Sequence, residues 1–284
     1  MLRTLTEPGR GYGVAVLAGM AKPLVPDELW MLIEPLLPPE RPKPKGGRPA
    51  IPHRAGLSGI ILVLKSGLPW EMLPQEMGCG SGMTCWRRLR DWQAAGVWTR
   101  LHRVLLDRLG RVPSVGAAPA GTVPLFRPKG GEETGPNPTD RGRAGSKRHL
   151  ITDAKGVPLA LRLTAANIHD SRLFAEPIDA VPPIRHGVGR PQRRPAKLPA
   201  DKGCDFPRCR TALRRRAIQS RIARRGIESS ERLGRHRWVI ERTLAWFSRS
   251  RRLTVRYERR VNIFEPFHHL AAALICQRFV QRFC

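Results

Sequence analysis

The chain has 284 residues, and its 51 Lys+Arg against 23 Asp+Glu give a formal net charge of +28 at pH 7. Hydrophobic residues make up 41% of the chain, which is enough to build a core, but no apolar run reaches the roughly 18 residues that span a bilayer. This composition excludes an integral membrane protein and a collagen-like or wholly disordered chain, and the charge predicts binding to a polyanion, with nucleic acid as the expected partner.

Residues 1–23 are expected to be an N-terminal extension. Residues 12–21 follow Arg10 and have the apolar character of a short signal segment. The alternative, which we favour, is that the true start is Met20, because nothing further along the chain indicates secretion. The six cysteines lack the paired spacing of a zinc site and are too few for a disulfide scaffold, so a reducing cytoplasm is the expected compartment.

Residues 24–110 are predicted to form a helical DNA-binding domain, because apolar residues recur there at helical spacing. The predicted helices are residues 27–37, 55–65, 70–77, 83–92 and 97–109.

The turn at residues 78–81 joins two of these helices in the manner of a helix-turn-helix motif. The helix after the turn has apolar residues on one side and arginines toward the other. The arginines, which are candidate DNA ligands, are Arg87, Arg88 and Arg90. The alternative is a helical bundle whose basic face is only solvated.

Residues 111–145 are predicted to be an irregular linker rich in proline and glycine, and residues 146–284 to be an α/β domain. The predicted strands are residues 149–152, 157–164, 196–200 and 220–223. The predicted helices are residues 171–180, 208–217, 230–249 and 264–283, with Pro266 in the first turn of the last one.

Two acids stand out in these basic surroundings. Asp201 directly follows a predicted strand, and Glu241 lies in the middle of a predicted helix. Carboxylate oxygens suit Mg²⁺ or Mn²⁺, so both acids could hold one metal if the helix packs beside the strand. The alternative is that Asp201 caps a turn and that Glu241 pairs with Arg237 or Arg242 at helical spacing.

Several ordered strings of this chain resemble the bacterial insertion-sequence transposases of the DDE class. They are TGPNPTDRGRAGSKRHL at residues 134–150, LTAANIHDS at 163–171, ADKGCD at 200–205 and IARRGIESSERLGRHRWVIERTLAW at 222–246. Residues 78–98 are similar to the N-terminal DNA-binding region of the same family, so the resemblance spans residues 24–280.

This resemblance implies an RNase H-like catalytic domain with a mixed sheet, preceded by an all-α, helix-turn-helix-like domain. It implies two Mg²⁺ or Mn²⁺ ions that act in cleavage of a DNA strand at the ends of the element and in strand transfer. The catalytic, metal-binding residues carried over are Asp201 and Glu241, and the candidate DNA ligands are Lys147, Arg148, Arg237 and Arg242. The implied partners are the terminal inverted repeats and target DNA, bound by a homodimer at the nucleoid of a bacterial cytoplasm.

One acid of the family's triad is missing from its expected place. The resemblance expects the first Asp near Gly121, but no Asp or Glu occurs between Asp107 and Glu132. Two carboxylates hold one metal poorly and cannot bridge two, so we expect impaired cleavage. Three hypotheses follow: a transposase, active or decayed; a non-catalytic DNA-binding remnant; and a general basic nucleic-acid binder.

A few further side chains are candidates for supporting roles. Trp86 and Trp238 could stack on nucleic-acid bases, with packing in the core as the alternative for both. His169 and Asp170 could support the acid site, with hydrogen bonding within their own loop as the alternative.

Overall fold

The computed structural model describes residues 23–40, 46, 49–110, 131–138, 140–185, 189–200, 202–224, 226–227 and 230–284, and of residues 230–237 it describes the backbone alone. Most of the predicted extension, with Met20, and residues 111–130 of the predicted linker therefore lie outside the described residues. Within the described ranges, we find no helix long and apolar enough to cross a membrane.

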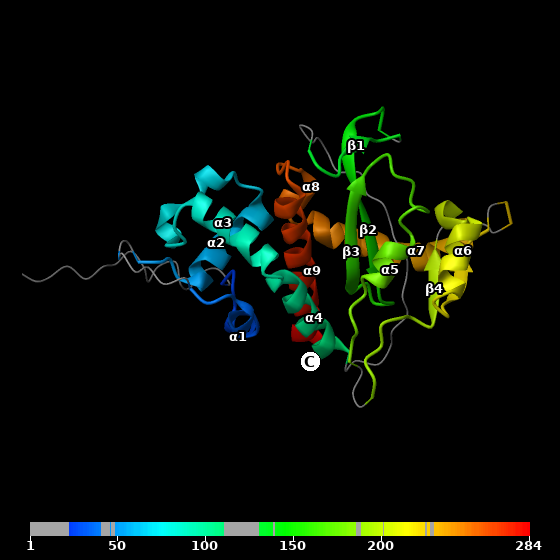
Figure 1. Cartoon of the computed structure of the whole chain (residues 1–284), viewed down its shortest axis with the longest axis horizontal. Helices are drawn as coiled ribbons and strands as arrows, with labels where there is room; N and C mark the ends of the chain where they lie inside the picture. The colour runs from blue at the N-terminus through cyan, green and yellow to red at the C-terminus, as the bar shows by residue number, and fades with distance from the viewer. Residues whose placement is uncertain are drawn as a thin grey trace, which may run out of the picture.

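Helices dominate the described part of the chain that precedes residue 111 (Figure 1). The α-helices are α1 (Asp27–Ile33), α2 (His53–Ser66), α3 (Gly82–Ala94) and α4 (Val97–Leu109). Residues next to two of these helices determine where the helices end or begin. Gly67 ends α2 with a φ of 74°, and the Ser81 side chain accepts a hydrogen bond from the Thr84 backbone N–H at the start of α3. The prediction for residues 97–109 is confirmed at both ends.

The prediction of a helix at residues 70–77 is wrong. Two 3-10 turns, η2 (Trp70–Met72) and η3 (Gln75–Met77), lie there instead. Pro74 separates them, because it has no N–H to donate and disfavours a helical backbone at Leu73, which is extended. A third 3-10 turn, η1 (Glu34–Leu36), continues α1 and contains Pro35. Helix α2, together with η2, packs against α3, so the predicted partner of α3 at residues 70–77 is not an α-helix.

The described strands form two sheets. In the first, β1 (Gly135–Pro136), β2 (Ala144–Thr152) and β3 (Pro158–Ala165) are antiparallel, and Leu150 of β2 pairs with Leu161 of β3. In the second, β4 (Lys197–Ala200) and β5 (Gln219–Ile222) are parallel. A parallel pair requires a crossover, and the helix α6 (Pro207–Arg214) lies between these two strands in the chain and packs on β5. Helices and strands together confirm the predicted α/β class, but among the described residues the antiparallel and parallel pairs lie in two separate sheets and not in one mixed sheet.

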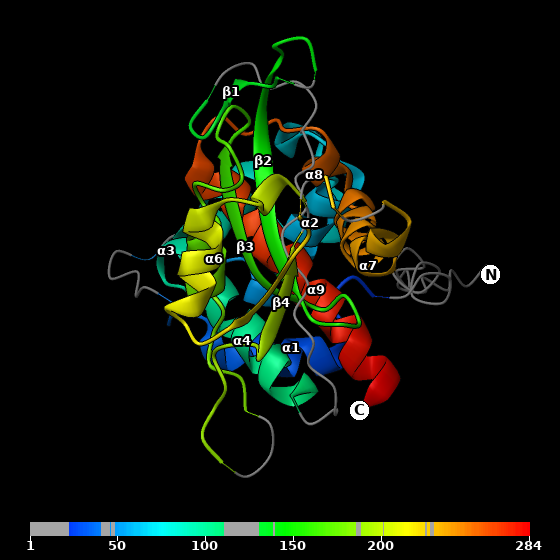
Figure 2. The ribbon, with the colours of Figure 1, turned by 90° about the vertical axis from the view of Figure 1, so that its right-hand side faces the viewer.

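The remaining helices come from the last 110 residues. They are α5 (Ala175–Asp179), η4 (Lys202–Cys204), α7 (Ser230–Ser248), α8 (Arg251–Thr254) and α9 (Val261–Phe283). The expectation that Pro266 lies in the first turn of the last helix is wrong, because α9 begins at Val261 and Pro266 lies inside it. In Figure 2, α6 lies on one side of β4 and α7 on the other.

The long helix α9 joins the two parts of the described structure. It packs against α3 and α4 on one side and against β3 on the other (Figure 1). The Trp70 and Phe267 rings stack with their centres 5.8 Å apart, and buried residues from both parts form one hydrophobic core. The segments predicted as separate domains, 24–110 and 146–284, thus share a core, and their boundaries stay a prediction.

A buried ion pair ties the end of α2 to the C-terminal part of the chain. The Arg252 guanidinium donates to Glu258 Oε1 through Nε (2.8 Å) and Nη2 (2.6 Å), and both residues are buried. Its Nη1 donates to the carbonyls of Gly67 and Leu68, each at 3.2 Å. Burial raises the pKa of Glu258, and the charge of Arg252 opposes this rise. The guanidinium therefore satisfies Oε1 of a buried carboxylate and the carbonyls that follow α2.

Replacing Arg252 should destabilise the whole fold. We expect Arg252→Met to lower the free energy of unfolding by about 3–5 kcal/mol, because it leaves the Glu258 carboxylate buried without its counter-charge. Urea titration followed by circular dichroism measures this change. The matched control is Arg251→Met at the exposed neighbour, which should change stability by no more than about 0.5 kcal/mol. Equal effects of the two substitutions would contradict the role of the buried pair.

Candidate functional site

The two acids predicted to bind metal are only partly placed by the structure. Asp201 lies outside the described residues, between the end of β4 at Ala200 and the start of η4 at Lys202. Glu241 lies in α7 and is exposed. Among the residues whose side chains are described, no group of three His, Cys, Asp or Glu could hold a metal ion. That Asp201 and Glu241 meet in space stays a prediction.

The helix that carries Glu241 is fixed to the turn between β2 and β3. The Arg242 Nη2 donates to the Lys155 carbonyl at 2.6 Å, and the Thr243 hydroxyl lies 2.8 Å from the Gly156 carbonyl oxygen. Gly156 has a φ of 86°, and a Cβ built on it would come within 2.7 Å of Thr243 Oγ1. The close approach of α7 and the left-handed backbone therefore both require glycine in this turn. As a result, Glu241 has a defined position relative to the hairpin.

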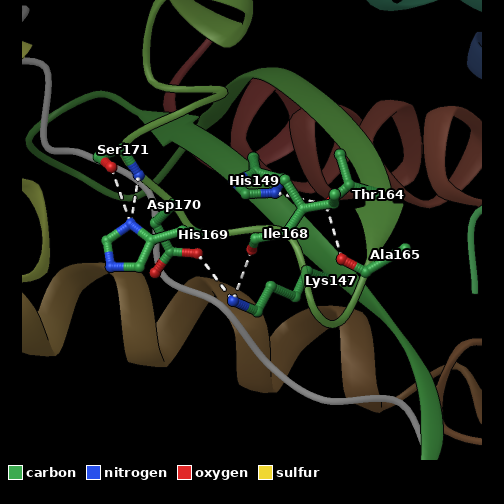
Figure 3. A network of polar contacts seen from close by, with 8 residues as sticks. All are labelled: Lys147, His149, Thr164, Ala165, Ile168, His169, Asp170 and Ser171. Atoms are coloured by element: carbon green, nitrogen blue, oxygen red, sulfur yellow. Dashed lines mark hydrogen bonds and ion pairs between the residues drawn. The ribbon is translucent and has the colours of Figure 1, made fainter. Parts of the chain in front are cut away.

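A polar network lies on β2 and on the loop that follows β3 (Figure 3). Lys147 Nζ donates to the Ile168 carbonyl at 2.9 Å and lies 3.2 Å from Asp170 Oδ1. The His149 Nε2 lies 2.8 Å from Thr164 Oγ1, and burial lowers the pKa of His149, so this imidazole is neutral at pH 7. The charge of Lys147 is thus balanced by Asp170, which limits its value as a DNA ligand.

The second half of this network involves the loop residues predicted to support the site. His169 Nδ1 lies 2.8 Å from the Ser171 hydroxyl, to which Arg208 Nη2 donates at 2.6 Å. Hydrogen bonding within the loop, the alternative weighed above, is thus present at His169. Asp170, unlike His169, lines a small and mostly apolar pocket, together with Leu198 of β4 and Cys204 of η4. The loop therefore lies next to the two elements that flank position 201.

Arg148, a candidate DNA ligand, is a core residue. Its side chain is fully buried, Nε donates to His268 Nε2 at 2.9 Å, and Nη2 donates to the Leu253 carbonyl. Burial lowers the pKa of Arg148 to about 10 and the pKa of His268 well below its usual value, so His268 is neutral and can accept this hydrogen bond. The prediction that Arg148 contacts DNA is wrong, because the side chain bonds α9 and α8 instead of reaching solvent.

Other predicted DNA ligands also have partners within the protein. Arg88 donates to the carbonyls of Ile51 and Pro52, Arg90 pairs with Asp91 at 2.8 Å, and Arg242 bonds the hairpin turn. Arg87 is exposed, and the side chain of Arg237 lies outside the described part.

The two tryptophans that were candidates for stacking differ in burial. Trp86 is partly buried against the core, as its alternative interpretation predicts. Trp238 is 49% exposed, so the alternative that it packs in the core is wrong.

One group of exposed cations lies around β4, β5 and α6. They include Arg190, Arg193, Lys197, Arg215, Arg221 and Arg224. Residues 185–225 contain only two acids in the sequence, Asp201 and Asp205, and Asp205 pairs with Arg210 at 2.6 Å. The excess of positive charge in residues 185–225 is visible in the sequence, but none of these cations is among the predicted DNA ligands.

The chain matches family models along most of its length. Residues 25–102 match a family described as a putative transposase of the IS4/5 family, and residues 112–276 match the transposase DDE domain. Over 153 residues the chain is 50% identical to the putative transposase for insertion sequence element IS402 of Burkholderia cepacia, which covers 54% of this chain and 72% of that protein.

A second match concerns another protein of the same element. Over 92 residues the chain is 65% identical to the insertion element IS402 uncharacterized 16.2 kDa protein of Burkholderia cepacia, which covers 32% of this chain and 63% of that protein. No solved structure gives a significant match.

Proposed function

Since the chain belongs to the DDE transposase family of insertion sequences, whose members act on DNA and use a divalent metal, we propose that Asp201 and Glu241 are its metal-binding carboxylates. Mg²⁺ or Mn²⁺ would supply charge stabilisation and an activated oxygen at the scissile phosphate. The support is the chemistry of the two residues and their place in the chain. Asp201 follows a strand that is paired in parallel, and Glu241 is exposed on a helix fixed to the neighbouring hairpin.

The sequence lacks the first acid of the family's triad at its expected place. It contains no Asp or Glu between Asp107 and Glu132, and two carboxylates alone cannot bridge two metal ions. We therefore propose that this copy is impaired in cleavage and retains DNA binding. The absence of that acid from the sequence is the observation that carries this proposal.

Cleavage of element-end DNA tests the proposed impairment. We expect the chain as written to cleave duplexes of the flanking inverted repeats, in Mg²⁺ or Mn²⁺, no faster than its Glu241→Gln variant. Gly121→Asp should restore metal-dependent cleavage, because it returns a carboxylate to the expected position. The assay is separation of end-labelled strands on denaturing gels. Robust cleavage by the unaltered chain that Glu241→Gln abolishes would contradict the proposed impairment.

Duplex DNA is proposed to bind the exposed face of β4 and β5. In this parallel pair Pro199 lies opposite Arg221, and Lys197 lies opposite Gln219. The alternating residues Leu198, Ala200 and Ile222 are buried, so Lys197 and Arg221 project from the opposite, exposed face of the two strands. One cation on each of two adjacent strands can neutralise phosphates of a DNA backbone, and this releases counterions. Terminal repeats and target DNA, bound by a dimer, are the proposed duplex partners.

Charge reversal on this face should weaken DNA binding and its dependence on salt. We expect Lys197→Glu/Arg221→Glu to lower duplex affinity by about tenfold or more and to reduce the slope of log K against log salt by about two, at roughly 0.9 for each phosphate that the protein no longer neutralises. Fluorescence anisotropy at several salt concentrations measures both quantities. The control is Arg259→Glu/Arg260→Glu, an equal change in charge at exposed residues away from these strands. An equal reduction of the slope in both variants would contradict a localised interface.

A further inference from the structure

The connection between β1 and β2 carries two arginines on a part of the sheet that projects from the protein. It lies at the upper end of both views, beyond the neighbouring helices (Figure 1, Figure 2). Arg141 and Arg143 are exposed, and a Cβ built on Gly142 between them would meet no atom within 4 Å. Within the described part of the chain, neither guanidinium forms a hydrogen bond or an ion pair. We call residues 140–143 the arginine turn.

Backbone hydrogen bonds fix the conformation of the arginine turn. The Asn137 N–H donates to the Arg143 carbonyl at 2.8 Å, and the Arg143 N–H donates to the Asp140 carbonyl at 2.9 Å. The Gly142 N–H donates to the Asn137 carbonyl at 3.0 Å. Arg141 has a φ of 49°, which is unfavourable for a side chain of this size. The hydrogen bonds therefore hold Arg141 in a conformation that an unrestrained loop would rarely adopt.

The base of this two-stranded ribbon is anchored to the rest of the protein. The Ser146 hydroxyl donates to the Glu133 carbonyl at 2.5 Å, and the buried Arg256 donates to Ser146 Oγ through Nη1 at 2.5 Å. A Cβ built on Gly135 would collide with Asn167 Oδ1, so β1 packs closely on the loop that follows β3. This is the loop that lies next to the elements flanking position 201. The arginine turn thus projects from a fixed base beside that loop.

The charges on the arginine turn favour base edges over a phosphate backbone as its ligand. Asp140 lies next to Arg141 in the turn, and within the described residues it forms no ion pair. A carboxylate repels phosphates and acidic protein surfaces alike, but it accepts a hydrogen bond from the N4 amino group of cytosine. A guanidinium donates two hydrogen bonds to O6 and N7 of guanine. An acid and two arginines in one turn therefore match G·C base pairs.

The width of the ribbon favours the major groove of a duplex. The major groove is about 12 Å wide and admits two antiparallel strands, whereas the minor groove is only about 6 Å wide. The guanine N7 and O6 and the cytosine N4 all lie in the major groove. Since Gly142 adds no side chain at the tip, the arginine turn is slender enough to approach the base edges.

We propose that the arginine turn enters the major groove of duplex DNA at the ends of the element, where Arg141 and Arg143 donate to guanine and Asp140 accepts from cytosine. The proposal rests on the proposed function for the identity of this duplex. The contact itself requires neither a metal nor cleavage, because it is a binding step.

Base analogues in a duplex of the flanking inverted repeat test this contact by fluorescence anisotropy, with EDTA present throughout. In one probe 7-deazaguanine, which lacks N7 in the major groove, replaces guanine. In a second probe the replacement is inosine, which lacks the minor-groove amino group. We expect the full chain to bind the 7-deazaguanine duplex about tenfold more weakly than the unmodified duplex, and the inosine duplex about equally. Arg141→Ala/Arg143→Ala should lose this discrimination against 7-deazaguanine.

Two control variants separate base recognition from charge. Arg141→Lys/Arg143→Lys keeps the charge without the planar pair of donors, so it should bind unmodified DNA more tightly than the alanine variant but show no discrimination. Arg259→Ala/Arg260→Ala removes an equal charge from exposed residues outside the turn, and it should keep the discrimination. Unchanged melting temperatures show that the variants are folded.

The outcomes either support or overturn the contact. Discrimination against 7-deazaguanine that only the variants of the arginine turn lose supports it. A full chain that binds the unmodified and 7-deazaguanine duplexes equally would overturn it, as would an alanine variant that discriminates as strongly as the full chain. Weaker binding of the inosine duplex that the alanine variant abolishes would assign the turn to the minor groove and also overturn the proposal.

A failure of the proposed function gives a different result. Lys197→Glu/Arg221→Glu should bind all three duplexes more weakly by the same factor and keep the discrimination against 7-deazaguanine. Undiminished affinity in that variant would contradict the proposed face on β4 and β5, and it would leave the contact of the arginine turn intact.

Discussion

The structure depends on buried guanidinium groups that bond backbone carbonyls across the chain. Arg252 connects the carbonyls after α2 to Glu258, and Arg148 connects β2 to His268 of α9 and to Leu253 of α8. Arg256 does the same for the segment before β1, donating to the Glu132 carbonyl at 2.7 Å and to the Glu258 carbonyl at 2.8 Å. A buried guanidinium has five donors to satisfy. Arg252 and Arg256 donate through all three of their nitrogens, whereas Nη1 of Arg148 has no hydrogen-bond partner among the described residues. Hence the N-terminal helices and the hairpin are held to the same C-terminal helices.

Because some cations are buried or paired within the protein, the net charge of the chain overstates the charge that is available to bind DNA. Some of the cations that contribute to the net charge of +28 are buried, as Arg148 is. Others form ion pairs within the protein, as Lys147 does with Asp170. The charge that remains for a polyanion lies on exposed side chains, and those around β4, β5 and α6 are accompanied by few acids in the sequence. In a transposase, cations that bind the phosphates should lie near the acids that hold the metal. The strand β4, which precedes Asp201, is the place that we propose for these cations.

Much of the architecture could be predicted from the sequence where one local signal is strong. The amphipathic period of residues 97–109 and the turn residues 153–156 between apolar strands identify α4 and the β2–β3 hairpin. The split of residues 70–77 into two 3-10 turns depends on one proline, whose effect competes with a helical pattern. The burial of Arg148 and the exposure of Trp238 depend on which helices pack on β2 and on the hairpin. Such tertiary contacts leave no periodic trace in the sequence, so the expected DNA contact of Arg148 and the core alternative for Trp238 were wrong.

The central claim is that Asp201 and Glu241 hold one divalent metal between them, although 40 positions separate them in the chain. The most direct test loads the protein with Fe²⁺ and adds hydrogen peroxide, with ascorbate to reduce the Fe³⁺ that forms. Hydroxyl radicals released from the peroxide then cut the backbone beside the bound metal, and the fragments are identified by mass spectrometry. The account predicts cuts near both residues 201 and 241, and the loss of both sets of cuts in Glu241→Gln. Cuts near only one of the two acids, or cuts that Glu241→Gln leaves unchanged, would contradict it.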